Sequence, residues 1–141
     1  MKISYQLDLS ELPRITRAMK TELDKEIEQV VMNTTRKVSL NAKSFVTVKE
    51  AGIKSSIRPL YKGKTGEVIV SSDHAPYVEF GTGSKAIIPT ELKAIAAQWW
   101  THKQWEGMDA QPYYYPAVFI GRDKFNKDMD AAYGKVINKR R

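Results

Sequence analysis

The chain has 141 residues, of which 42% are hydrophobic and 28% charged, so it is long enough to bury a core without a covalent staple. It contains no cysteine, which excludes a disulfide framework and a thiolate metal site and fits assembly in a reducing cytoplasm. No apolar run approaches the ~20 residues that span a bilayer, and the N-terminus lacks the apolar centre of a signal peptide, so we expect neither a membrane protein nor an exported one.

The net charge of +7 is concentrated in one part of the chain. Residues 36–64 hold eight basic side chains and a single acidic one, Glu50. Such a basic band could face DNA phosphates, an acidic neighbouring subunit or only water, and aromatic residues that stack on bases are sparse within it. Its candidate DNA-facing residues are Arg36, Lys37, Lys43, Lys49, Lys54, Arg58, Lys62 and Lys64.

The first predicted element is a long amphipathic helix over about residues 10–46. Asp8 and Glu11 have the spacing of a capping box, and Pro13 is tolerated only in a first turn, so the helix is expected to begin near Ser10. The segment 33–35 could interrupt it, but the pattern favours one continuous or bent helix. Its mainly apolar stripe consists of Leu12, Ile15, Met19, Leu23, Ile27, Val30, Val31, Thr34, Val38, Ala42 and Phe45.

A hairpin is predicted next. Strands are expected over residues 53–61 and 67–72, joined by a turn at residues 62–66 whose two glycines would supply positive φ. Pro59 cannot donate a ladder hydrogen bond, so the first strand is expected to lie at a sheet edge or to be bulged at this residue. Alternation in the second strand predicts that Val68 and Val70 lie on its more buried face.

Two further extended segments are predicted, and both are rich in aromatic residues. Residues 77–80 should form a short third strand that ends at residues 81–84, and residues 113–115 lie between two prolines, which favour extended neighbours. Strand alternation would place Tyr77 and Glu79 on one face of the third strand. In the other segment, at least one of the three adjacent tyrosines should point outward.

Two more helices complete the pattern. Residues 89–105 predict a helix with three tryptophans, Trp99, Trp100 and Trp105, and residues 117–137 predict the C-terminal helix, followed by a basic tail. We therefore predict an α+β fold in a single domain over residues 1–141. It would consist of a small, mostly antiparallel sheet of three to four strands (about residues 53–83 and 112–116) flanked by a long N-terminal helix and a C-terminal helix.

No residue pattern indicates an enzyme. His74 and His102 are the only histidines and have no zinc-ligand spacing. Glu79 has no evident partner carboxylate, nucleophile or oxyanion donors, and its carboxylate is expected to accept hydrogen bonds from the glycine-threonine turn or from a neighbouring subunit. We expect no catalytic residue, no cofactor and no metal.

Two short motifs carry the most information. Tyr77-Val78-Glu79-Phe80-Gly81-Thr82-Gly83 is followed about thirty residues later by Ala110-Gln111-Pro112-Tyr113-Tyr114-Tyr115-Pro116-Ala117. This pair, in this order, resembles the signature of small tailed-phage proteins, the tail completion or head-tail joining (neck) family of the lambdoid minor tail protein Z type. The resemblance covers about residues 45–120. Its expected interface or motif residues are Tyr77, Glu79, Phe80, Gly81, Thr82, Gly83, Gln111, Pro112, Tyr113, Tyr114, Tyr115 and Pro116.

The resemblance implies a non-enzymatic virion protein of a bacteriophage or prophage that completes the tail end and joins it to the head. Its expected partners are copies of itself in a homohexameric ring, a tail tube or tail terminator protein, and a head connector protein, with passing DNA in the lumen facing the basic band. It would reside in the tail or neck of the virion. The alternative from the residues is a basic DNA-binding accessory protein, and a bacterial toxin module is a third class that nothing in the sequence favours.

Overall fold

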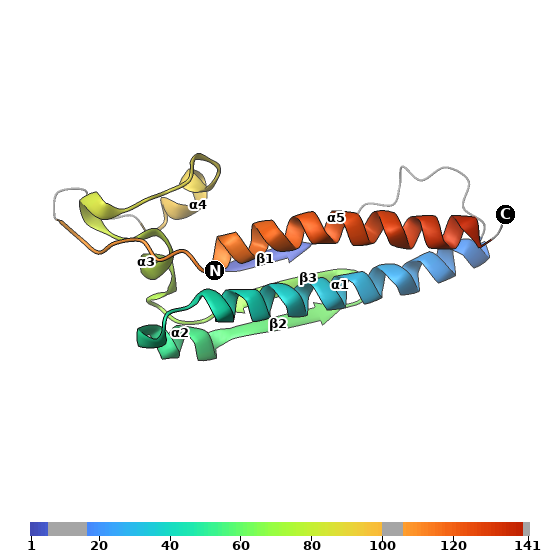
Figure 1. The fold of residues 1–141 in the computed structure, drawn as a ribbon, viewed down its shortest axis with the longest axis horizontal. Helices are drawn as coiled ribbons and strands as arrows, with labels where there is room; N and C mark the ends of the chain where they lie inside the picture. Colours follow the sequence, from blue (N-terminus) through green and yellow to red (C-terminus); the bar gives the residue numbers. More distant parts are fainter. Residues whose placement is uncertain (6–16, 100–105, 140–141) are drawn as a thin grey trace.

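A computed structural model describes residues 1–5, 17–99 and 106–139. Two long helices, α1 (Arg17–Phe45) and α5 (Tyr114–Asn138), run antiparallel along the molecule (Figure 1). The short helices α2 (Ala51–Ser56), α3 (Ala75–Phe80) and α4 (Lys93–Ala96) gather near the end of α1 and the start of α5. Short 3-10 helices span Val48–Glu50, Gly83–Lys85 and Thr90–Leu92.

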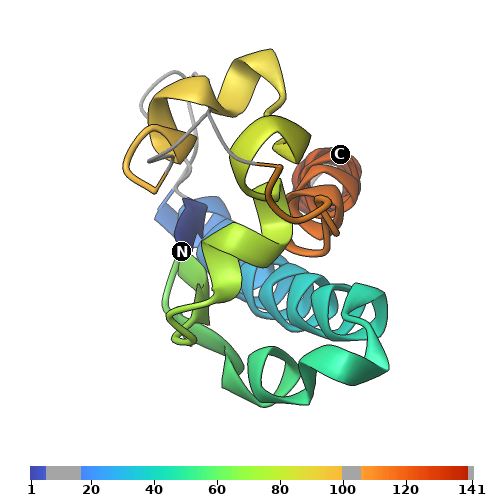
Figure 2. The ribbon, with the colours of Figure 1, turned by 90° about the vertical axis from the view of Figure 1, so that its left-hand side faces the viewer.

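The sheet has the order β1-β3-β2 and is antiparallel throughout, with β1 at Lys2–Tyr5, β2 at Ile57–Lys62 and β3 at Thr65–Val70. One side of α1 packs against β2 and β3 and another packs against α5 (Figure 2). The long N-terminal helix, the antiparallel hairpin, the C-terminal helix and the α+β class are therefore confirmed. α1 runs unbroken through the segment 33–35, whereas its expected start near Ser10 lies outside the described residues.

The hairpin turn differs from the prediction in its glycines. Gly63 has a φ of 57°, as a two-residue turn between paired Lys62 and Thr65 requires, but Gly66 lies within β3 without positive φ. A Cβ on Gly66 would lie 2.0 Å from Thr35 Oγ1, so the absence of a side chain there lets α1 approach the sheet. Pro59 lies in β2, an outer strand, as expected.

Parts of three predicted extended segments are helical. Ile53, placed in a strand, belongs to α2. Residues 77–80 belong to α3, which begins with Pro76 in its first turn, and Tyr114 starts α5 with Pro116 in its first turn. Proline fits both first turns because its missing N–H would have no helical partner there. The third and fourth predicted strands are therefore wrong, and the third strand of the sheet is β1, which was not predicted.

The described part of the tryptophan-rich segment, residues 89–99, forms less helix than predicted. Within residues 89–99 only the 3-10 helix and α4 are regular, with Leu92 and Ala96 buried and Trp99 partly buried. Trp100, His102 and Trp105 lie outside the described residues. None of the helices in the described ranges is long and apolar enough to cross a membrane.

The core is divided into two clusters along the molecule. The larger one joins the end of α1, the sheet, α3 and the start of α5. The smaller one holds α1 and α5 together near the other end and consists of Leu23, Ile27, Val31, Phe125 and Val136. Buried positions on α1 recur at helical spacing, as expected for a helix that packs against both the sheet and α5.

Candidate functional site at the junction of α3 and α5

The two sequence motifs meet at one buried carboxylate. Glu79, on α3, accepts hydrogen bonds from the backbone N–H of Tyr113 and Tyr114 at Oε2 (2.7 and 2.8 Å) and of Tyr115 at Oε1 (2.9 Å). These amides form the N-terminus of α5, where backbone N–H groups lack helical partners and carry a partial positive charge. Tyr113 provides no side-chain cap, so Glu79 caps α5 from 34 residues away.

Burial and hydrogen bonding act on Glu79 in opposite directions. The side chain is 2% exposed, and this burial raises the pKa of its carboxyl group above the ordinary value. The three backbone N–H donors stabilise the charged form and limit that rise. Burial, with the charge of Glu79 as a smaller cause, also raises the pKa of the Tyr113 and Tyr115 hydroxyls. The junction thus holds a buried carboxyl group on which burial and hydrogen bonding act in opposite directions.

All three tyrosines are buried, contrary to the expectation that one points outward. The Tyr113 hydroxyl donates to the backbone oxygen of Ala75 in α3 (3.3 Å), and the Tyr114 hydroxyl donates to that of Val68 in β3 (2.7 Å). The Tyr115 ring stacks on Phe80 with centroids 5.7 Å apart. A helix start can direct three successive side chains to three different partners, which a strand cannot do.

The glycine-threonine half of the motif is joined to the segment that precedes α5. Thr82 N–H donates to the Met108 oxygen and Met108 N–H donates to Thr82 Oγ1, both at 2.9 Å, while Gln111 N–H donates to the Val78 oxygen at 2.8 Å. Gly81, Gly83 and Gly107 all have positive φ. A Cβ on Gly81 would lie 2.7 Å from the Ala110 nitrogen, so these glycines allow close backbone approach.

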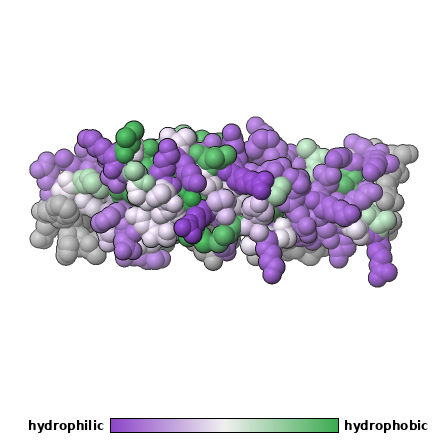
Figure 3. All heavy atoms as spheres, turned by 90° about the horizontal axis from the view of Figure 1, so that it is seen from below, coloured by the Kyte–Doolittle hydropathy of each residue, from purple (hydrophilic) through white to green (hydrophobic). Residues whose placement is uncertain are grey.

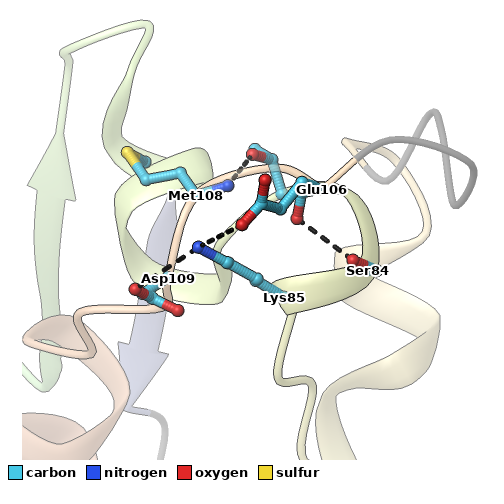
Figure 4. Close-up of polar contacts among 6 residues, drawn as sticks. Ser84, Lys85, Glu106, Met108 and Asp109 are labelled. Carbon is cyan, nitrogen blue, oxygen red and sulfur yellow. Dashed lines mark hydrogen bonds and ion pairs between the residues drawn. The ribbon is translucent and has the colours of Figure 1, made fainter.

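Exposed polar contacts border this junction (Figure 4). The Lys85 ammonium lies 3.3 Å from Glu106 and 4.0 Å from Asp109, and Ser84 Oγ donates to the Glu106 backbone oxygen at 3.1 Å. Sequence reasoning did not select Lys85, Glu106, Met108 or Asp109. The signal that could have found them is Gly107, because a glycine before a motif indicates a backbone constraint.

The geometry of the junction is that of an anchor for α5. Both oxygens of Glu79 are occupied by backbone donors and the side chain is buried, so the carboxylate has no room to act on an outside molecule. Among the described residues no group of three or more His, Asp or Glu side chains could hold a metal ion. His74 is exposed just before α3.

The other predicted motif residues divide by exposure. Phe80, Gly81 and Gly83 are buried, while Tyr77, Thr82, Gln111 and Pro116 are partly exposed and Pro112 is exposed. The partly and fully exposed residues are the ones that can meet a neighbouring molecule in this conformation. Their place at a subunit interface stays a prediction.

The basic band does not converge on one point. Its residues are spread over α1, the following 3-10 helix, α2, β2 and the hairpin turn, and all are at least partly exposed. Lys64 pairs with Asp24 at 2.6 Å, and Arg36 donates to the Tyr61 hydroxyl at 2.7 Å while lying over its ring. The side of the molecule seen from below carries mostly hydrophilic side chains with apolar groups between them (Figure 3).

No family model, curated protein or solved structure matches this chain.

Proposed function

We propose that the chain is a structural, non-enzymatic virion protein of a tailed bacteriophage or prophage that completes the tail end and joins the tail to the head. The observation that carries this proposal is the Glu79 junction. Glu79 in the first motif and Tyr113 in the second are 34 residues apart, yet the Glu79 carboxylate accepts hydrogen bonds from three backbone amides of the second motif. A chance resemblance of two short segments would not require that they form one buried unit.

The proposed assembly is a homohexameric ring, located in the tail or neck of the virion. In a closed ring each subunit presents one surface to a different surface of the next. The elongated shape supports this arrangement because two long sides can serve as the two surfaces (Figure 1). The proposed neighbours are a tail tube or tail terminator protein on one side and a head connector protein on the other, with DNA passing through the lumen beside the basic band.

Two measurements test the proposal. Light scattering over a concentration series should give a mass near six subunits, alone or after addition of purified tails. Purified protein added to tails and DNA-filled heads from a phage that lacks its own joining protein should restore infectious particles. Failure of the joining assay with correctly folded protein would refute the joining role, whatever the mass.

The basic band supports a second candidate, a DNA-binding accessory protein. For this function the affinity for a duplex should fall steeply with salt, with a logarithmic slope close to the number of contacted phosphates. A joining protein should show weak binding or none. Because Lys64 and Arg36 already have partners within the chain, we place this candidate second.

A further inference from the structure

A groove of about 380 Å³ runs between α1 and α5, on the side of α1 away from the sheet. Each wall is a row of side chains one helical turn apart. On α1 the row consists of Asn33, Lys37 and Asn41, and on α5 it consists of Ile120, Lys124 and Asp128. Thr34 and Gly121, both buried, lie between the rows.

The antiparallel register of the two helices places these rows opposite each other. Glu26 pairs with Lys135 and Glu22 pairs with Lys139, so the residue number on α5 falls as much as the number on α1 rises. The same register sets Lys37 opposite Lys124 in the middle of the groove. Asn33 then faces Asp128 at one end, and Asn41 faces Ile120 at the other.

Two features of this groove indicate a missing acceptor of hydrogen bonds. Thr34 is 3% exposed, and its hydroxyl has no hydrogen-bond partner among the described residues, which is costly for a buried polar group. Lys37 and Lys124 face each other across the groove, and like charges so placed repel. Lys124 is paired with Asp128 on its own helix, whereas no ion pair within the described ranges includes Lys37.

We propose that this groove binds an extended acidic peptide segment of a partner protein, with one carboxylate between Lys37 and Lys124. Asparagine side chains both donate and accept hydrogen bonds, so Asn33 and Asn41 can each pair with peptide backbone. Residues four apart on a helix are about 6 Å apart along its axis, close to the two-residue repeat of an extended chain at ~6.7 Å. Alternate residues of an extended peptide can therefore contact successive pairs of facing groove residues.

Ile120, which faces Asn41 at one end of the groove, defines the second feature of the ligand. Ile120 is 51% exposed, so it offers an apolar contact next to the two lysines. Because side chains two apart in an extended segment point the same way, the expected ligand has an acidic residue and an apolar residue two positions from each other. This proposal concerns a different surface from the Glu79 junction and does not depend on the joining role.

Nucleic acid fits the groove less well than a peptide does. A DNA strand carries a phosphate at every nucleotide, so the neighbours of a phosphate held by Lys37 would meet the carboxylate of Asp128 at one end and the apolar Ile120 at the other. A peptide can place a single carboxylate between uncharged neighbours. The charge pattern of the groove therefore favours the peptide.

The test uses the full chain labelled with ¹⁵N and two short peptides with blocked ends, whose central sequences are Asp-Ser-Leu and Leu-Ser-Asp. At least one peptide, at millimolar concentration, should shift the amide signals of residues 33–41 and 120–128. The same peptide with Asn in place of Asp should bind at least about tenfold more weakly, as expected for loss of a charge-assisted contact.

Variants separate the groove from general charge. Lys37→Glu should reduce affinity about tenfold or more, whereas Lys127→Glu, an equal charge change on α5 outside the groove, should reduce it less than about twofold. Thr34→Val, which keeps the shape of the side chain, should weaken binding with the fold intact by circular dichroism. Absence of shifts with both peptides, equal effects of the two lysine variants, or stronger binding of a DNA duplex than of the peptides would overturn the proposal.

Discussion

The junction and the groove use polar residues in opposite ways. At the junction the buried carboxylate of Glu79 has three donors, and the hydroxyls of Tyr113 and Tyr114 each have an acceptor. In the groove the buried hydroxyl of Thr34 has no partner among the described residues. A satisfied polar group holds a fold together, while an unsatisfied one costs stability until something binds it. Substitutions should therefore have opposite signs in the two regions.

The largest effect is expected from Glu79→Ala. This change leaves the N–H groups of Tyr113, Tyr114 and Tyr115 without their acceptor and opens a gap between α3 and α5, so the free energy of unfolding should fall by about 3–5 kcal/mol. Urea unfolding followed by circular dichroism measures it. Glu106→Ala, at the exposed border of the same junction, is the control and should change stability by less than about 0.5 kcal/mol.

A smaller loss is expected from Gly107→Ala. Gly107 has a φ of 76°, and a Cβ there would lie 1.8 Å from the Thr82 backbone oxygen, so the loop would have to move and break its bonds to Met108. We expect a loss of about 2–3 kcal/mol in unfolding free energy. Gly52→Ala in α2, where the Cβ meets nothing within 4 Å, should instead stabilise by up to about 1 kcal/mol. Equal results for the two variants would contradict the close approach of the two loops.

The groove should respond with the opposite sign. Thr34→Val removes a buried hydroxyl that has no partner in the described part of the chain, so the free energy of unfolding should rise by about 1 kcal/mol. Its neighbour gives a matched comparison, because the buried Thr35 hydroxyl donates to the Val31 oxygen at 2.7 Å. Thr35→Val should lower stability by about 1 kcal/mol. Thermal unfolding of the two variants side by side is decisive, and a loss in both would show that Thr34 is already satisfied.

The pH dependence should give the smallest effect. Burial raises the pKa of Glu79 in the folded protein above its ordinary value of 4.5, so the folded state holds this proton more readily than the unfolded state does. The associated stability is present below pH 4.5 and is lost as pH rises through the folded pKa. The unfolding free energy of the wild type minus that of Glu79→Gln should therefore decrease with rising pH. An increase would mean that the three amides outweigh burial.

Sequence patterns predicted the parts of the fold that depend on local periodicity. In the described part of the α1 stripe, Leu23, Ile27, Val31, Val38 and Ala42 are buried and Met19 and Val30 are partly buried, whereas Phe45, also predicted on the stripe, is 42% exposed. Val68 and Val70 are buried on one face of β3, as their alternation predicted. The aromatic residues at 77–80 and 113–115 led to a wrong prediction of strands, because strands and buried helix starts are both rich in aromatic residues. The prolines at 76 and 116 were the better signal, since each lies in the first turn of a helix.

The functional features that were missed depend on contacts between distant segments. The capping of α5 by Glu79 requires α3 to fold against it, and no local rule predicts a cap from 34 residues away. The pairing of β1 with β3 joins residues more than sixty positions apart. The groove likewise arises from the register of α1 against α5, which ion pairs such as Glu26 with Lys135 define only in the folded chain.

Amide hydrogen exchange at Tyr113, Tyr114 and Tyr115 reports on the three N–H groups that donate to Glu79. In the wild type these amides should exchange as slowly as the interior of α5, although first-turn amides normally exchange fast. In Glu79→Gln they should exchange much faster than the rest of that helix. Fast exchange in the wild type, or no change in the variant, would contradict the capping of α5 by Glu79.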